Sequence, residues 1–170
     1  SGGLMAHFFQ ALDARRIPIA YRVSTGNEVG VQIGDFVAHL ADDPSLRVIA
    51  CYAEHIRDPQ RFLAAVHRAR AAGKTVVLLH PGRTERAQKA AASHTGALAG
   101  DWDVMAACVT DAGVVLVESM DEMIDVTDLL VRFPEPPVQG VAVLTTSGAL
   151  CAHANDCCEA LGLEVPAFSP

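Results

Sequence analysis

The sequence lacks long apolar runs, and this absence excludes one class of protein. Its longest apolar stretches are short, such as those at residues 75–80 and 141–146, whereas a membrane-spanning helix needs about 20 consecutive apolar residues. No basic segment followed by an apolar one is visible at the start, which is the pattern of a secretion signal. We therefore expect a protein that is neither inserted in a membrane nor secreted.

Basic residues are scarce as well. Lys and Arg total 13 against 20 Asp and Glu, which gives a formal net charge of −7. Because proteins that bind nucleic acid usually hold the phosphate backbone with basic patches, this charge argues against a nucleic-acid partner. A phosphate group would have to be held by backbone N–H groups and helix N-termini instead of a lysine cluster. With 51% hydrophobic and 19% charged residues, the composition is typical of a globular protein.

The sequence also lacks a disulfide framework, since its five cysteines are odd in number and irregularly spaced. We expect reduced thiols and a cytoplasmic location. Cys151, His153, Cys157 and Cys158 suggest a zinc site at first sight. On a helix, however, His153 and Cys157 share one face while Cys151 and Cys158 share another, and no second ligand pair exists. We therefore predict no metal site.

Apolar periodicity alternates between helical and strand patterns along the chain. Helices are predicted at residues 4–15, 31–40, 59–72, after Arg83 to about 92, 101–111 and 121–131, and strands at 17–24, 46–54, 74–80 and 114–119. Such alternation predicts an α/β fold with a doubly wound parallel sheet.

A proline-rich stretch, FPEPP at residues 133–137, is the clearest boundary. Three prolines in five residues end a helix and stiffen a linker. We predict a first domain at residues 1–133, a linker at 134–139, and the beginning of a second, incomplete domain at 140–170. In this last part the pattern predicts a strand at 140–146 followed by a helix that ends at Gly162.

An internal repeat links the two predicted domains. SGGLMAHFFQALDARRIPI at the start aligns without gaps with SGALCAHANDCCEALGLEV, and in the second copy an apolar strand runs directly into the Ser-Gly pair. By analogy we expect a strand ahead of the first copy, and hence a chain that is a piece of a longer protein. A Ser-Gly turn after a strand starts a helix whose first N–H groups have no partner, so each copy is either an anion site or an ordinary turn of the fold. The candidate phosphate-binding residues are Ser1, Gly2, Gly3, Ser147, Gly148 and Ala149.

The stretch SHTGALAG at residues 93–100 places a single imidazole, His94, among small and apolar residues. Three roles are open to His94: a loop histidine, a metal ligand or a nucleophile. The stretch supplies no further ligands for a metal. A neutral imidazole is a good phosphoryl acceptor at neutral pH, because one of its ring nitrogens is unprotonated.

The segment HPGRTERAQKAAASHTGALAG resembles the phosphohistidine segment of NDP-forming acyl-CoA synthetases. This family includes ADP-forming acetyl-CoA synthetase and is related to succinyl-CoA synthetase. The similarity extends to SGG at the start, STGNE at residues 24–28, CYAEHIRD at 51–58, the linker and TTSGAL at 145–150. It implies a flavodoxin-like, doubly wound domain followed by the start of a second similar domain.

The resemblance also implies an activity, acid + CoA + ATP = acyl-CoA + ADP + phosphate. His94 would carry the phosphoryl group, and Glu54 at a strand end would orient the imidazole unless it is simply a surface carboxylate. Thr95, Gly96 and the two helix starts would bind the phosphate. The small carboxylic acid would be the substrate. CoA, ATP or ADP, and Mg²⁺ would be bound mostly by a CoA-binding Rossmann domain and an ATP-grasp domain or subunit outside this chain, within an oligomer, so the chain alone should be inactive.

Two other functions stay open. Similar domains occur in protein-lysine acetyltransferases, where they bind or regulate and need no nucleophilic histidine, and a plain scaffold role is the third possibility. Among the remaining polar residues, His55 and His80 are interpreted as structural or supporting, and Asn27 and Glu28 as shaping the site. Arg83 either contacts phosphate or caps a turn.

Overall fold

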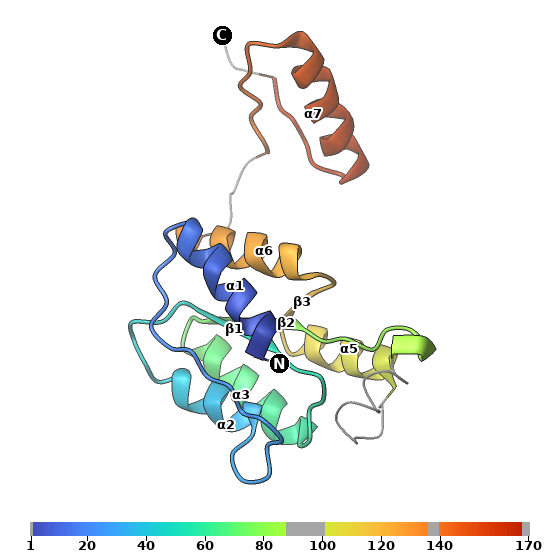
Figure 1. Ribbon diagram of the computed structural model, residues 1–170. Coiled ribbons are helices and arrows are strands. Elements are labelled where there is room, and N and C mark those ends of the chain that lie inside the picture. Colours follow the sequence, from blue (N-terminus) through green and yellow to red (C-terminus); the bar gives the residue numbers. More distant parts are fainter. Residues whose placement is uncertain (1, 88–100, 136–139, 168–170) are drawn as a thin grey trace. The chain divides into compact units, whose positions relative to one another are not determined.

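The computed structural model describes residues 2–87, 101–135 and 140–167. It divides into two compact units, Ser1–Pro134 and Glu135–Pro170, and Figure 1 shows the chain with its elements labelled. In order, these elements are α1 (Gly2–Ala14), α2 (Ile33–Leu40), β1 (Val48–Tyr52), α3 (Pro59–Ala71), β2 (Thr75–Leu79), α5 (Trp102–Asp111), β3 (Val115–Val117), α6 (Met120–Arg132) and α7 (Gly148–Ala160).

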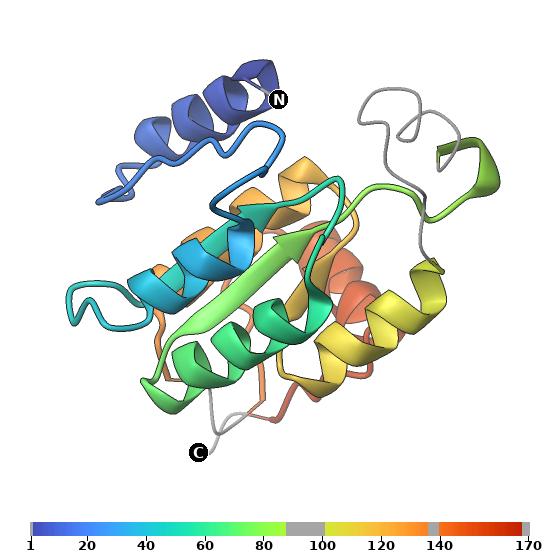
Figure 2. The same cartoon turned by 90° about the horizontal axis from the view of Figure 1, so that it is seen from below.

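The first unit is built on a parallel sheet of three strands in the order β1-β2-β3. Val48 lies opposite Thr75 and Tyr52 opposite Leu79, while Val77 lies opposite Val115. Helices cover both faces: α2, α3 and α5 pack on one, and α1 and α6 on the other (Figure 2). This is the predicted α/β arrangement with a parallel sheet.

The central strand β2 shows why the sequence forms this sheet. Its last four residues are all buried, as expected for a parallel strand covered on both faces. Because side chains alternate across a strand, Val76 and Leu78 pack under α2, α3 and α5, whereas Val77 and Leu79 pack under α1 and α6. The continuous apolar run therefore supplies two separate cores.

Local signals set the helix ends. Asp58 caps α3 by accepting a hydrogen bond from the Arg61 N–H at 3.0 Å, and Pro59 follows at the first helical position, where its missing N–H costs nothing. Gly73 ends the same helix region with φ of 73°, a conformation that glycine adopts without strain. These boundaries lie within two residues of the predicted ones.

Helices α1 and α6 are joined at their C-terminal ends by two arginines. Arg15 forms an ion pair with Asp125 at 2.6 Å, and Arg132 Nη2 donates to the Arg15 carbonyl oxygen at 2.7 Å. Arg132 also pairs with Asp128 of its own helix. Both arginines therefore connect the end of α1 to α6. We call these four residues the arginine clasp.

Two predicted strands are not strands in the structure. Residues 17–24 carry no strand assignment and form no ladder, and residues 140–146 likewise carry none. A strand needs a ladder of hydrogen bonds to a neighbouring strand. Among the described residues, 17–24 have no such neighbour, and 140–146 have only the single bond from the Val141 N–H to the Glu164 oxygen, at 3.0 Å. The predicted helix after Arg83 starts at Glu85 and is described as far as Ala87.

The second unit contains α7, which Ser147 caps by accepting from the Leu150 N–H at 3.4 Å. Cys158 is its buried residue, while Leu144 is 99% exposed. The prediction that residues 140–170 begin a second domain is not tested by this arrangement and stays a prediction. In the described part of the chain, no helix has the length and apolar character needed to cross a bilayer.

Candidate functional site

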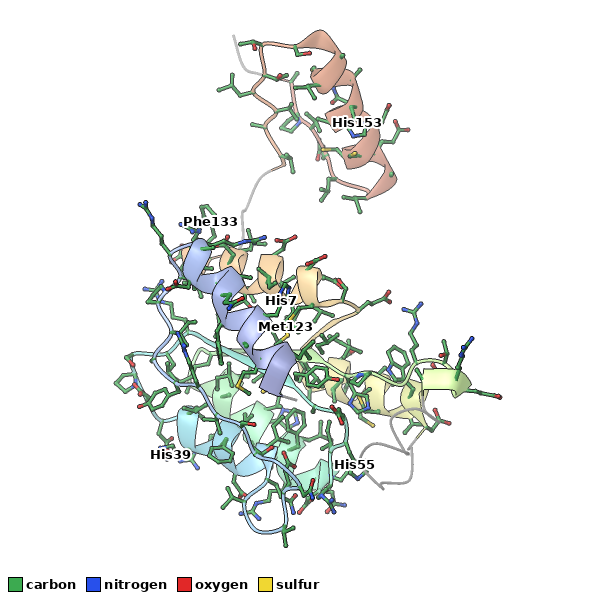
Figure 3. The ribbon with its side chains drawn as sticks, viewed as in Figure 1. His7, His39, His55, Met123, Phe133 and His153 are labelled. Atoms are coloured by element: carbon green, nitrogen blue, oxygen red, sulfur yellow. The ribbon has the colours of Figure 1, made fainter. Side chains whose placement is uncertain are left out.

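The three parallel strands end at one edge of the sheet, and each is followed there by a charged or titratable side chain. Glu54 and His55 come just after β1, His80 follows β2 directly, and Glu118 follows β3 directly. Ligands of doubly wound sheets bind at this carboxyl edge. His55 is labelled in Figure 3.

Glu54 is half-buried in the bend after β1. Burial, the negative charge of Glu54 and a hydrogen bond to its carboxylate all raise the pKa of Tyr52. The carboxylate therefore lies beside the Tyr52 hydroxyl, at the end of the edge strand. Glu54 thus follows β1 at a strand end, while its orienting role toward His94 stays a prediction.

His80 holds the backbone next to Glu54. Its Nδ1 lies 2.6 Å from the Ala53 carbonyl oxygen, and because a carbonyl only accepts, Nδ1 carries the proton and Nε2 is left as an acceptor. Burial lowers the pKa of His80, the bond to Ala53 opposes that effect, and nearby His55 lowers it further. The imidazole is thus a neutral brace between β1 and β2.

Arg83 pairs with Glu118 across the ends of β2 and β3. The Glu118 N–H in turn donates to the Glu122 carboxylate at 2.7 Å, at the start of α6. In the described structure Arg83 forms an ion pair between strand ends, and the phosphate contact considered for it stays a prediction.

The loop at residues 24–28 reaches the same region. Glu28 has φ of 53°, and its Oε1 accepts a hydrogen bond from the Thr25 hydroxyl at 2.8 Å. Its other oxygen, Oε2, is buried and has no partner among the described residues. Glu28 also acts on Cys51, because burial first and the Glu28 charge second raise the pKa of that thiol to about 12. Cys51 is therefore protonated and is no nucleophile at neutral pH.

The predicted phosphate-binding residues are described only in part. Gly3 lies in the first turn of α1, and Gly148 and Ala149 begin α7 behind the cap Ser147. With respect to the residues that the structure describes, the space where a Cβ would stand is open at both Gly3 and Gly148, so a group could approach either backbone. Gly2 begins α1, whereas Ser1, His94, Thr95 and Gly96 lie outside the described residues. Their convergence on one site remains a prediction.

The described part of the chain holds no cluster of three or more His, Cys, Asp or Glu side chains able to bind a metal ion. Cys157 Sγ lies 3.9 Å from His153 Nε2, whereas Cys158 is buried and Cys151 is half-buried. His153 is labelled on α7 in Figure 3. Two side chains one helical turn apart do not complete a zinc site.

Comparison with known proteins identifies the family of this chain. A model of the succinyl-CoA ligase-like flavodoxin domain matches residues 1–130. Over 165 residues the chain is 42% identical to trans-feruloyl-CoA synthase from an unknown prokaryotic organism, covering 97% of this chain and 23% of that protein. Over 150 residues it is 33% identical to the α subunit of ADP-forming acetate–CoA ligase I from Pyrococcus furiosus, covering 88% of this chain and 32% of that subunit.

A solved structure is similar over almost the whole chain. It is the dinucleotide-forming acetyl-coenzyme A synthetase 1 of Ca. Korarchaeum cryptofilum, in complex with phosphate and ADP. The TM-score is 0.85 at 27% identity, and the match covers 97% of this chain and 36% of that one. The chain thus spans about a quarter to a third of the relatives it matches.

Proposed function

We propose, from the premise that this chain belongs to the succinyl-CoA ligase-like flavodoxin family, that it is the phosphoryl-carrying part of an ADP-forming acyl-CoA synthetase. The overall reaction is acid + CoA + ATP = acyl-CoA + ADP + phosphate, and His94 is the carrier. Homology to ADP-forming acid–CoA ligases supports the reaction class.

The chemistry assigned to His94 is a nucleophilic exchange at phosphorus. In the direction of ATP formation, phosphate first displaces CoA from acyl-CoA to give an acyl phosphate, and an unprotonated ring nitrogen then attacks its phosphorus: a P–N bond forms and the P–O bond to the acyl oxygen breaks. The acid leaves as a carboxylate, and the phosphoryl group passes to ADP in a second exchange; acyl-CoA synthesis runs these steps in reverse. Phosphoryl transfer of this kind needs positioning and charge stabilisation more than covalent help from the protein.

Glu54 is the observation that carries the proposal. Its carboxylate stands at the carboxyl end of β1 beside Tyr52, and the preceding carbonyl is held by His80 at 2.6 Å. A carboxylate that accepts a hydrogen bond from one ring nitrogen fixes the tautomer of a histidine and leaves the other nitrogen free to attack. Glu54 is assigned this orienting role toward His94.

Phosphate binding is assigned to the backbone of the two helix starts. No described residue fills the space where a Cβ would stand at Gly3 or Gly148, and the first N–H groups of a helix, together with its dipole, favour an anion. With a net charge of −7, the chain has few cations to offer for this purpose. We assign Ser1, Gly2, Gly3, Thr95, Gly96, Ser147, Gly148 and Ala149 to this binding.

The test is phosphorylation of the enzyme that contains this chain together with its nucleotide-binding region. With [γ-³²P]ATP and Mg²⁺, the unaltered enzyme should acquire acid-labile, base-stable label, and His94→Ala should abolish it. Glu54→Gln should slow labelling about 10²-fold or more, since it removes the orienting charge. His67→Ala, an exposed position on α3, is the matched control and should label normally.

Undiminished labelling of His94→Ala would refute the carrier role. Absence of label from the unaltered enzyme, with retained binding of CoA or nucleotide, would favour a binding or regulatory role such as that of the acetyltransferase-associated domains. The acid can then be identified by turnover with acetate and ferulate as first candidates, because both acids occur in the names of relatives.

A further inference from the structure

Four charged or titratable side chains share one end of a cavity in the first unit. The cavity has a volume of about 430 Å³, and its lining includes Glu28, Glu54, His55 and Arg57. The last three follow β1, and Glu28 acts on Cys51 near the end of that strand. His55, labelled in Figure 3, marks this end of the cavity. We call these four residues the edge cluster, because they lie at the carboxyl edge of the sheet, where such sheets bind ligands.

Arg57 is the cation of the edge cluster, and it has no anionic partner. Its exposed side chain forms no ion pair, hydrogen bond or ring contact with any residue that the structure describes. Most of its counterparts in the first unit are neutralised by carboxylates, since ion pairs are formed by Arg15, Arg61, Arg68, Arg83 and Arg132. The guanidinium of Arg57 is therefore available to a ligand.

The carboxylates nearest to Arg57 in the chain and in the cavity are engaged elsewhere. Asp58, the next residue, caps α3 by accepting from the Arg61 N–H at 3.0 Å. Glu28 accepts from the Thr25 hydroxyl at 2.8 Å, and Glu54 acts on the Tyr52 hydroxyl. A guanidinium gains a charge-assisted hydrogen bond from a carboxylate within reach, yet the described residues supply none to Arg57. An anion for this position has to come from outside the described chain.

The edge cluster also needs a cation if a phosphate group is to enter it. Glu28 and Glu54 both place carboxylates in the lining, and a phosphoryl group on a protein carries a charge of about −1.5 to −2 at neutral pH. Like charges at short range repel strongly where water is partly excluded. Arg57 is the one Lys or Arg in the described lining of the cavity, and the planar fork of a guanidinium matches phosphate oxygens in pairs.

We propose that Arg57 binds the phosphate oxyanion of the reaction at the edge cluster. The oxyanion is inorganic phosphate in the ATP-forming direction, and the phosphoryl group derived from it afterwards. The inference rests on the proposed acyl-CoA synthetase activity but not on His94 as the carrier. It adds one side-chain cation to the backbone N–H groups assigned to phosphate binding. Arg57 and Glu54 then have opposite tasks, because one neutralises the phosphate while the other accepts from the imidazole.

The experiment measures the KM for inorganic phosphate in the enzyme that contains this chain together with its nucleotide-binding region. The ATP-forming direction is followed with ADP, Mg²⁺ and either acetyl-CoA or feruloyl-CoA, the acyl groups in the names of relatives. Arg57→Gln should raise this KM at least about tenfold, because a charge-assisted hydrogen bond is lost. The KM for ADP should stay within about twofold. Arg57→Lys keeps the charge without the fork, so its KM for phosphate should lie in between.

The matched control is Arg47→Gln, the same substitution at an exposed arginine directly before β1, at the opposite edge of the sheet. Its KM for phosphate should equal that of the unaltered enzyme. A second readout is chemical rescue: millimolar guanidinium should lower the KM for phosphate of Arg57→Ala and leave that of Arg47→Ala unchanged. A merely structural role of Arg57 would not respond to an added guanidinium ion.

An unchanged KM for phosphate in Arg57→Gln, with normal turnover, would overturn the inference and leave the proposed function intact. A raised KM for the acid alone, measured in the acyl-CoA-forming direction, would overturn it in favour of carboxylate recognition. Absence of phosphate-dependent turnover in the unaltered enzyme would refute the proposed function itself. Equilibrium binding of [³²P]phosphate then decides the role of Arg57, and equal binding by the unaltered protein and Arg57→Gln would overturn it.

Discussion

At the scale of single residues, one carbonyl connects two strand ends of the site. His80 Nδ1 binds the oxygen of Ala53, the residue before Glu54. The imidazole thereby fixes the stretch of backbone from which the orienting carboxylate projects. A change at position 80 therefore acts on Glu54 through the main chain.

This arrangement predicts a pH dependence of stability. The pKa of His80 is lowered from its ordinary value of 6.5, chiefly by burial, so the unfolded chain binds this proton more tightly than the folded one. The contribution is fully present above pH 6.5 and is lost as the pH falls through the lowered folded pKa. His80→Asn keeps an N–H donor near the Nδ1 position but does not titrate, so its free energy of unfolding should fall less between pH 7.5 and 5.5, as measured by urea unfolding.

The control for this prediction is His39→Asn, because His39 is exposed on α2. It should leave the pH dependence close to that of the unaltered protein. An unchanged slope in His80→Asn would contradict the burial of a neutral imidazole at this position.

Sequence reasoning located Glu54 at a strand end and assigned His80 a structural or supporting role, but it could not specify the bond of His80 to Ala53, and the reason is physical. Glu54 follows an apolar run closely, so its place at a strand end could be predicted from the sequence. The bond from His80 to Ala53 depends on the register that sets Tyr52 opposite Leu79, and register is a property of two strands together. The orphaned Glu28 oxygen depends likewise on folded neighbours.

At the scale of elements, the contact between α2 and α3 rests on Gly34. A Cβ built there would stand 3.2 Å from the Cα and N atoms of Phe62, which are backbone atoms and cannot turn aside. Gly34→Ala should therefore lower the free energy of unfolding by about 1–2 kcal/mol, measured by urea titration, although alanine favours a helix.

Gly30→Ala provides the comparison, since among the described residues, apart from the two chain neighbours, no atom lies within 4 Å of the Cβ it would introduce. Its effect should stay within about 0.5 kcal/mol. A Gly34→Ala protein as stable as Gly30→Ala would mean that the two helices separate without cost.

Helices were predicted better than strands, and the difference lies in where their hydrogen bonds go. A helix satisfies its backbone within one segment, so capping and periodicity suffice to predict α3 and α6. The strand pattern of residues 17–24 is apolar and β-branched, yet the described residues supply no neighbour to complete a ladder. β2 formed as predicted because it has a partner on each side.

At the scale of the whole molecule, the net charge of −7 disfavours binding of ATP by the isolated chain. An acidic surface repels a polyanion such as ATP. We therefore expect the 170-residue chain alone to acquire no label from [γ-³²P]ATP and Mg²⁺, and to be labelled once the nucleotide-binding region is supplied. Label on the isolated chain at a comparable rate would show that it binds the nucleotide itself.

The arginine clasp has a mechanical consequence. Arg132 is the last residue of α6, close to where the chain leaves the first unit. Its guanidinium donates a hydrogen bond to the carbonyl of Arg15, just after the C-terminal end of α1. A force on the segment after α6 is therefore borne by both α6 and α1. We expect a displacement of Arg132 to reach α1 through the clasp, and the opposite end of α1 carries Gly2 and Gly3.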